Sequence, residues 1–104
     1  MRRLLRVDSM QSMIFNCFHA ECFVVDMQGG VQRSQLNNSS PGQLYTFIIR
    51  QNQTGGHSFN WPMQCINPMP IDQRPHAIST QNFIASTGNR LLAIEPGSVS
   101  SANL

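Results

Sequence analysis

Large apolar residues recur at every second position along much of this chain, which is the pattern of β-strands that bury one face. In the segment 43–51 the regularly spaced residues are Tyr45, Phe47 and Ile49. The opposite face of that segment is more mixed and carries Leu44, Thr46, Ile48 and Arg50. We therefore expect a strand with one face in a core and the other face partly exposed or at an interface.

The same alternation, together with β-branched and aromatic residues, predicts further strands. They cover residues 13–18, 22–27, 57–61, 77–85 and 90–95. Residues 31–42 are polar and end in a loop over 37–42. The segment 62–76 contains four prolines, so we expect an extended crossing there and no helix.

Thr54 and the glycine pair Gly55-Gly56 directly follow the strand 43–51. The two glycines can adopt the positive φ angles that a tight hairpin needs. We expect an antiparallel return strand after them, with Phe59 and Trp61 on one face and next to the core. Thr87-Gly88-Asn89 is predicted to form the turn between the last two strands.

Turn signals recur about every ten residues, and no segment has a sustained helical apolar stripe, so the sequence predicts an all-β fold. We expect a single domain that resembles a β-sandwich or a jelly roll, over residues 12–97. Residues 1–11 could form a helical turn, a strand or an arm, and we treat them as an N-terminal arm. Residues 98–104 are expected to form a C-terminal tail.

Charged residues make up only 12% of the chain, against about 25% in an average soluble domain. No lysine is present, and amides and hydroxyls take the place of charges. A surface of this kind suits β-structure packed against neighbours, because neutral hydrogen bonds are not screened by salt as ion pairs are. The net charge of +2 is too small to indicate nucleic-acid binding, and no apolar run reaches the ~18 residues that span a bilayer.

The arginines cluster only at the start of the chain, where Arg2, Arg3 and Arg6 could dock on an acidic neighbouring surface or simply be solvated. The chain contains three cysteines, an odd number that cannot form a complete set of internal disulfides. Reduced, buried thiols of a protein made in a cytoplasm are the simplest explanation.

Cys17, His19 and Cys22 form the one cluster whose residue types resemble a zinc site. A fourth ligand would have to come from Cys65, His57 or His76. The spacing is not that of a zinc knuckle, so we favour core thiols and expect no metal or other cofactor, although the sequence does not decide this. The acidic residues are isolated and no Cys–His pair has an orienting third group, so we do not expect an enzyme.

The run 42–62 resembles a module of tailed-bacteriophage structural proteins, in which a G-Q-x-Y-T strand leads into a Q-x-x-T-G-G turn and a short strand ending in Trp. The segment 81–94 is similar to the closing hairpin of that module. The likeness covers about residues 22–97, but the crossing 65–70 lacks the extra Gly and second Trp of the family, and the last strand lacks its aromatics. These departures leave open which partner surface is used.

The resemblance implies a non-catalytic virion protein that is often oligomeric, either a trimer or a dimer. Because the sequence opens with Met1 and is short, we expect a complete gene product. We therefore predict a capsid decoration, cement or head-fibre protein that binds the major capsid lattice, with a tail fibre or a receptor- and glycan-binding tail module as the alternative. The residues predicted to contact partners are Arg2, Arg3, Arg6, Leu44, Ile48 and Arg50.

Overall fold

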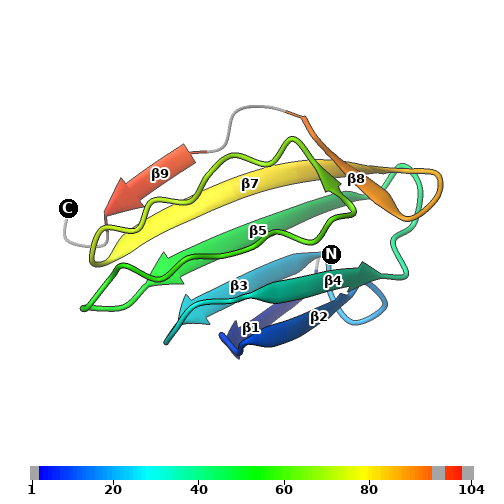
Figure 1. Ribbon diagram of the computed structural model, residues 1–104. Coiled ribbons are helices and arrows are strands. Elements are labelled where there is room, and N and C mark those ends of the chain that lie inside the picture. Colours follow the sequence, from blue (N-terminus) through cyan, green and yellow to red (C-terminus); the bar gives the residue numbers. More distant parts are fainter. Residues whose placement is uncertain (1–2, 95–97, 102–104) are drawn as a thin grey trace.

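The structure is all-β, and no helix occurs among the residues that it describes (Figure 1). The computed structural model describes residues 3–94 and the backbone of residues 98–101. The strands are β1 Leu4–Asp8, β2 Ser12–Asn16, β3 Cys22–Met27, β4 Arg33–Asn37, β5 Leu44–Gln51, β6 Cys65–Ile66, β7 Ala77–Ser86, β8 Arg90–Ala93 and β9 Ser98–Ser101. The expected all-β class is confirmed.

The first half of the chain alternates between two sheets (Figure 1). Strands β1, β3 and β5 lie side by side in a large sheet and run parallel. Strands β2 and β4 form a small parallel sheet of their own. Parallel neighbours cannot be joined by tight hairpins, because the chain must first travel back to the starting end. Here the small sheet is the return path.

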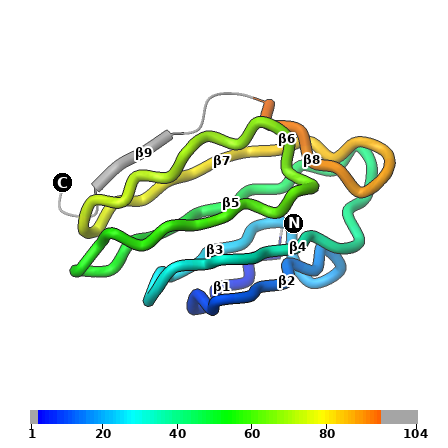
Figure 2. Tube along the Cα trace, viewed as in Figure 1, coloured from blue at the N-terminus to red at the C-terminus, as the bar shows by residue number. Residues whose placement is uncertain are grey.

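The second half of the chain completes the large sheet with antiparallel strands. Strand β7 pairs with β5 along one edge, and along its other edge it pairs with β8 and β9. The short strand β6 pairs parallel with β8 at the end of the sheet. Figure 2 follows the chain from β5 to β6 and back to β7 across the side of the large sheet that also carries β2 and β4.

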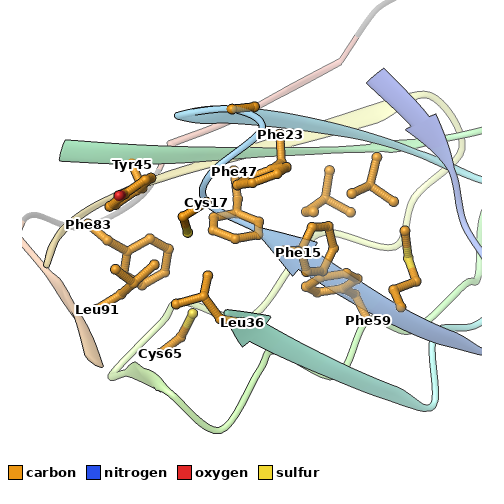
Figure 3. Close-up of a cluster of buried hydrophobic side chains, with 14 of the residues drawn as sticks. Phe15, Cys17, Phe23, Leu36, Tyr45, Phe47, Phe59, Cys65, Phe83 and Leu91 are labelled. Carbon is orange, nitrogen blue, oxygen red and sulfur yellow. The ribbon is translucent and has the colours of Figure 1, made fainter. Parts of the chain in front are cut away.

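The core lies between the two sheets and is rich in aromatic rings (Figure 3). Phe15 from β2 sits with its ring centroid 5.3 Å from that of Phe23 in β3 and 5.0 Å from that of Phe47 in β5. Both contacts are edge-to-face, the geometry that aromatic pairs prefer. Tyr45 and Ile49 are buried on the same face of β5. This shared burial, at roughly 25 cal/mol per Å² of apolar surface, holds the sheets together.

The polar segment 31–42 contains a strand, contrary to the sequence expectation. Leu36 is the only buried apolar residue of β4, so the segment shows no two-residue apolar period. Pairing with β2 supplies one set of backbone hydrogen bonds. On the other edge of β4, side chains bind the backbone groups of Leu36. Gln64 Oε1 accepts from the Leu36 N–H at 3.2 Å, and Asn89 Nδ2 donates to the Leu36 carbonyl at 2.8 Å.

The prediction that residues 57–61 return antiparallel along β5 is wrong. This segment lies beside the small sheet, where Phe59 makes a parallel bridge to Val31. At the end of β5 the buried Gln51 side chain holds His57, with its Nε2 donating to the His57 carbonyl at 2.7 Å. A side chain therefore replaces the expected hairpin ladder and lets the chain cross to the other layer.

Much of the segment that we treated as an N-terminal arm belongs to the large sheet, because Leu4–Asp8 forms β1 beside β3. Residues 98–101 of the expected tail form β9 beside β7. Residues 102–104 lie outside the described part of the chain. The predicted crossing at 62–76 contains the two-residue strand β6 and is otherwise irregular.

Candidate functional site on the outer face of the large sheet

Among the described residues, no segment covers one face of the large sheet, because the small sheet and the crossing segment lie on its other side (Figures 1 and 2). The strand register brings Leu44, Ile84 and Leu92 into one row across β5, β7 and β8 on this face. Leu44 is 45% exposed and Leu92 is 39% exposed. These three residues, which we call the apolar row, form a strip of partly exposed aliphatic surface at one end of the sheet.

The middle of the outer face is neutral. Ile48 of β5 lies opposite Val24 of β3 and Thr80 of β7. In the next pair on the same face, Thr46 of β5 lies opposite Asn82 of β7, and the Thr46 hydroxyl donates to Asn82 Oδ1 at 2.6 Å. A sheet face of aliphatic groups and paired neutral polar groups can be covered by another protein at a small desolvation cost.

The far end of the outer face carries an ion cluster. Asp26 of β3 accepts hydrogen bonds from Arg6 of β1, at 2.5 Å from Nε and 3.3 Å from Nη2. Arg50 of β5 lies on the other side, with its Nε 3.7 Å from Asp26 Oδ1. The hydrogen bond to Asp26 raises the pKa of Arg6 above its ordinary value. The Arg6 side chain is 58% exposed and that of Arg50 is 37% exposed, so solvent screens both ion pairs and the cluster contributes little to folding stability.

The residues predicted to contact partners separate into three groups. Leu44, Ile48, Arg50 and Arg6 lie together on the outer face. Arg3 lies beside β1, where its backbone N–H and guanidinium both donate to Glu21. Arg2 lies outside the described residues. Because Arg3 and Arg6 are held by acids of the same domain, they do not form a free basic arm.

Sequence reasoning missed Ile84 and Leu92, which complete the apolar row. They sit next to the buried residues Phe83 and Leu91, so alternation assigns them to an outward face. The sequence contains no sign that their strands lie next to β5. The row exists only because of the pairing β5–β7–β8.

Two hollows flank the sheets. One, of about 520 Å³, lies where β1, β3 and β5 end, and it is polar, with Asp8, Arg50 and His76 in its lining. The other, of about 460 Å³, lies over the outer side of the small sheet, with Ile14, Trp61 and Met63 in its lining. The second hollow is the more apolar, since Ile14 and Met63 are both strongly exposed.

Phe59 and Trp61, which we predicted next to the core, pack on each other with centroids 5.0 Å apart. Phe59 is buried, and Trp61 is half-buried, with its Nε1 donating to the Met69 carbonyl at 3.0 Å. Part of the Trp61 ring therefore remains at the surface of the second hollow.

The cysteines are free thiols, and those of Cys17 and Cys65 are buried in the core. Burial raises the pKa of Cys17 to about 11 and that of Cys65 to about 12. At neutral pH both thiols are protonated, whereas the thiolate is the reactive form of a cysteine. Across the described residues, no three His, Cys, Asp or Glu side chains gather so as to hold a metal ion.

Comparison of the chain with protein-family models, curated protein sequences and solved structures finds no significant match. Within the described residues, no helix is long and apolar enough to cross a membrane.

Proposed function

We propose that this chain is a non-catalytic structural protein of a tailed-phage virion that docks on another virion protein through the outer face of its large sheet. The observation that carries the proposal is the partly exposed apolar row Leu44–Ile84–Leu92 beside a neutral sheet face. Exposed aliphatic residues that adjoin each other across strands are typical of protein-binding surfaces. The resemblance of residues 42–62 to phage structural modules indicates the virion as the setting.

Within that class, a capsid decoration, cement or head-fibre protein on the major capsid lattice fits best. Such a protein has to bind in varying salt, and burial of aliphatic groups is not weakened by screening. We also infer that the two packed layers are a variant of the β-sandwich. The parallel pairs β1–β3, β3–β5 and β2–β4 argue against a jelly roll, whose strands are antiparallel.

A glycan-binding tail module is the second candidate, and the hollow over the small sheet favours it. Trp61 and the amides of Gln35 and Asn60 line this hollow. A half-buried aromatic ring beside amide groups can stack on a sugar with its accessible part, and the amides can hydrogen-bond to the sugar hydroxyls.

The test is binding to phage heads that lack the protein. Purified protein is mixed with such heads, the particles are sedimented, and the bound copies are counted. We expect saturable binding at hundreds of copies per head. The double variant Leu44→Ser/Leu92→Ser should bind about tenfold more weakly or worse, because burial of each leucine contributes on the order of 1.5–3 kcal/mol.

Ile14→Ser is the matched control, because it removes an exposed aliphatic side chain from the small sheet and leaves the apolar row intact. Wild-type binding by the Leu44→Ser/Leu92→Ser variant would contradict the proposed docking face. Absence of head binding, with a few copies in tails and binding to host surface glycans that Ile14→Ser or Met63→Ser weakens, would support the second candidate.

A further inference from the structure

Strand β1 is the edge strand of the large sheet, and within the described part of the chain nothing pairs with its outer side. Its odd-numbered residues hydrogen-bond to β3: the Arg3 carbonyl accepts from the Cys22 N–H at 3.0 Å, and the Ser9 N–H donates to the Asp26 carbonyl at 2.9 Å. Because backbone groups alternate in direction along a strand, the N–H and C=O groups of Leu4, Arg6 and Asp8 point outward. An uncovered row of this kind is a template for another strand.

The side chains along this edge can pair favourably with those of a second copy of β1 that runs in the opposite direction. On the outer face β1 carries Leu4, Arg6 and Asp8, which are apolar, positive and negative, and the exposed Met10 follows after the strand has ended. Leu4 and Met10 are each 63% exposed. Among the described residues, the Asp8 carboxylate makes no hydrogen bond and no ion pair within 4 Å. The edge therefore offers an acid that makes no ion pair with another described residue within 4 Å, two residues from an arginine whose charge it stabilises.

We propose that two copies of this chain pair through β1 in antiparallel orientation, about a twofold axis at Val7. In this register Arg6 of each copy lies opposite Asp8 of the other. Arg6 and Asp8 are residues whose backbone groups point outward, so each Arg6–Asp8 pair also forms backbone hydrogen bonds. Cross-strand pairs of opposite charge or of apolar residues are favourable on a sheet.

Neighbouring registers are worse. An axis at Arg6 places the two Arg6 side chains opposite each other, and like charges in opposed positions are destabilising. An axis at Leu5 leaves Asp8 without an opposed partner in the strand. A twofold axis placed between two residues would shift the register by one residue. The outer face of one copy would then continue into the inner face of the other, which the alternation of side chains along a strand does not allow. The charge order along β1 therefore selects the axis at Val7.

The pairing gives a single large sheet that runs through both copies. Strand β2 lies at the same end of the stack as β1 (Figure 1), so the axis also brings the two small sheets toward each other. The apolar row lies across β5, β7 and β8, well away from the axis. This inference is therefore separate from the proposed docking role, and the protein alone in solution tests it.

The experiment is sedimentation equilibrium of the full chain and of two variants, Asp8→Arg and Arg6→Asp. Wild type should be a dimer. Each variant alone places like charges opposite each other twice, so its dimer dissociation constant should rise about tenfold or more. An equimolar mixture of the two variants should recover dimers, because both opposed pairs then again join an acidic side chain of one copy to a basic side chain of the other.

Recovery on mixing is the decisive readout, since damage to folding or loss of the Arg6–Asp26 pair cannot be repaired by a second damaged chain. Asp72→Arg is the charge-matched control, because Asp72 lies on the segment that hydrogen-bonds to β7, and this variant should remain dimeric. A wild type that is monomeric at all concentrations would overturn the proposal. So would an Asp8→Arg variant that dimerises as tightly as wild type, or a mixture that does not recover dimers.

Discussion

Gly55 is required by its backbone angle and by its surroundings. Its φ angle is +68°, and a Cβ there would meet the Pro75 nitrogen at 2.7 Å and the Gln73 carbonyl oxygen at 2.8 Å. Its neighbour Gly56 has a φ angle of +75°, but a Cβ there would have no atom within 4 Å. Both positions therefore require glycine for its backbone angle, but only Gly55 also requires it for lack of space around the Cβ.

We expect Gly55→Ala to lower the free energy of unfolding by about 3 kcal/mol, as left-handed strain of about 1–2 kcal/mol adds to an overpacking cost of similar size. Gly56→Ala should cost only about 1 kcal/mol, because it carries the strain alone. Urea unfolding followed by Trp61 fluorescence measures both. Equal losses would mean that the contact with Pro75 relaxes freely.

At the scale of elements, the strands with a repeating apolar face could be found from the sequence, and β4 could not. The alternation Met13, Phe15, Cys17 predicts β2, and all three side chains are buried. Strand β4 owes its existence to backbone pairing with β2 and to side chains of Gln64 and Asn89 that arrive from distant parts of the chain. The end of β5 could not be predicted either, because there the Gln51 side chain forms the hydrogen bonds to His57 that a backbone strand would otherwise form.

Gln51→Leu should therefore destabilise the protein by about 2 kcal/mol, because the N–H and C=O of His57 lose their partners in a partly buried position. Gln53→Leu is the control, since Gln53 is exposed and its substitution should change stability by less than about 0.5 kcal/mol. Chemical denaturation of both variants checks this, and equal midpoints would refute the role given to Gln51.

At the scale of the whole molecule, one core serves both sheets, so they should unfold together. Cys17 and Cys65 belong to this core. Their folded pKa values of about 11 and about 12 lie above the ordinary value of 9.0, because burial disfavours the thiolate. The stability that this contributes is fully present below about pH 9 and is lost as the pH rises through the folded pKa values.

We expect the free energy of unfolding to be lower at about pH 10.5 than at about pH 8, by at least about 1 kcal/mol. The double variant Cys17→Ala/Cys65→Ala should lose less stability over the same interval, although it starts lower because of the cavities. Urea titrations at both pH values test this. If wild type and variant fell by the same amount, other groups would be responsible.

The candidate site was predictable only in part. Leu44, Ile48 and Arg50 follow from the mixed face of one strand. Their companions Ile84 and Leu92 come from strands far along the chain, and the acid that holds Arg6 lies on β3. Alternation within a segment tells which way a side chain points, and it carries no information about which strand is next to it.

The sequence by itself determined the all-β class, the buried face of β5 and the positive φ angles at Gly55 and Gly56. These features depend on residue type and local period, so a short window contains all the information. Tertiary structure alone decided the parallel pairing, the strand β4, the crossing of 57–61 to the other layer and the incorporation of residues 4–8 as an edge strand. These features depend on pairing between distant segments, where burial and hydrogen bonding of the whole chain select one arrangement among many that satisfy the same local pattern.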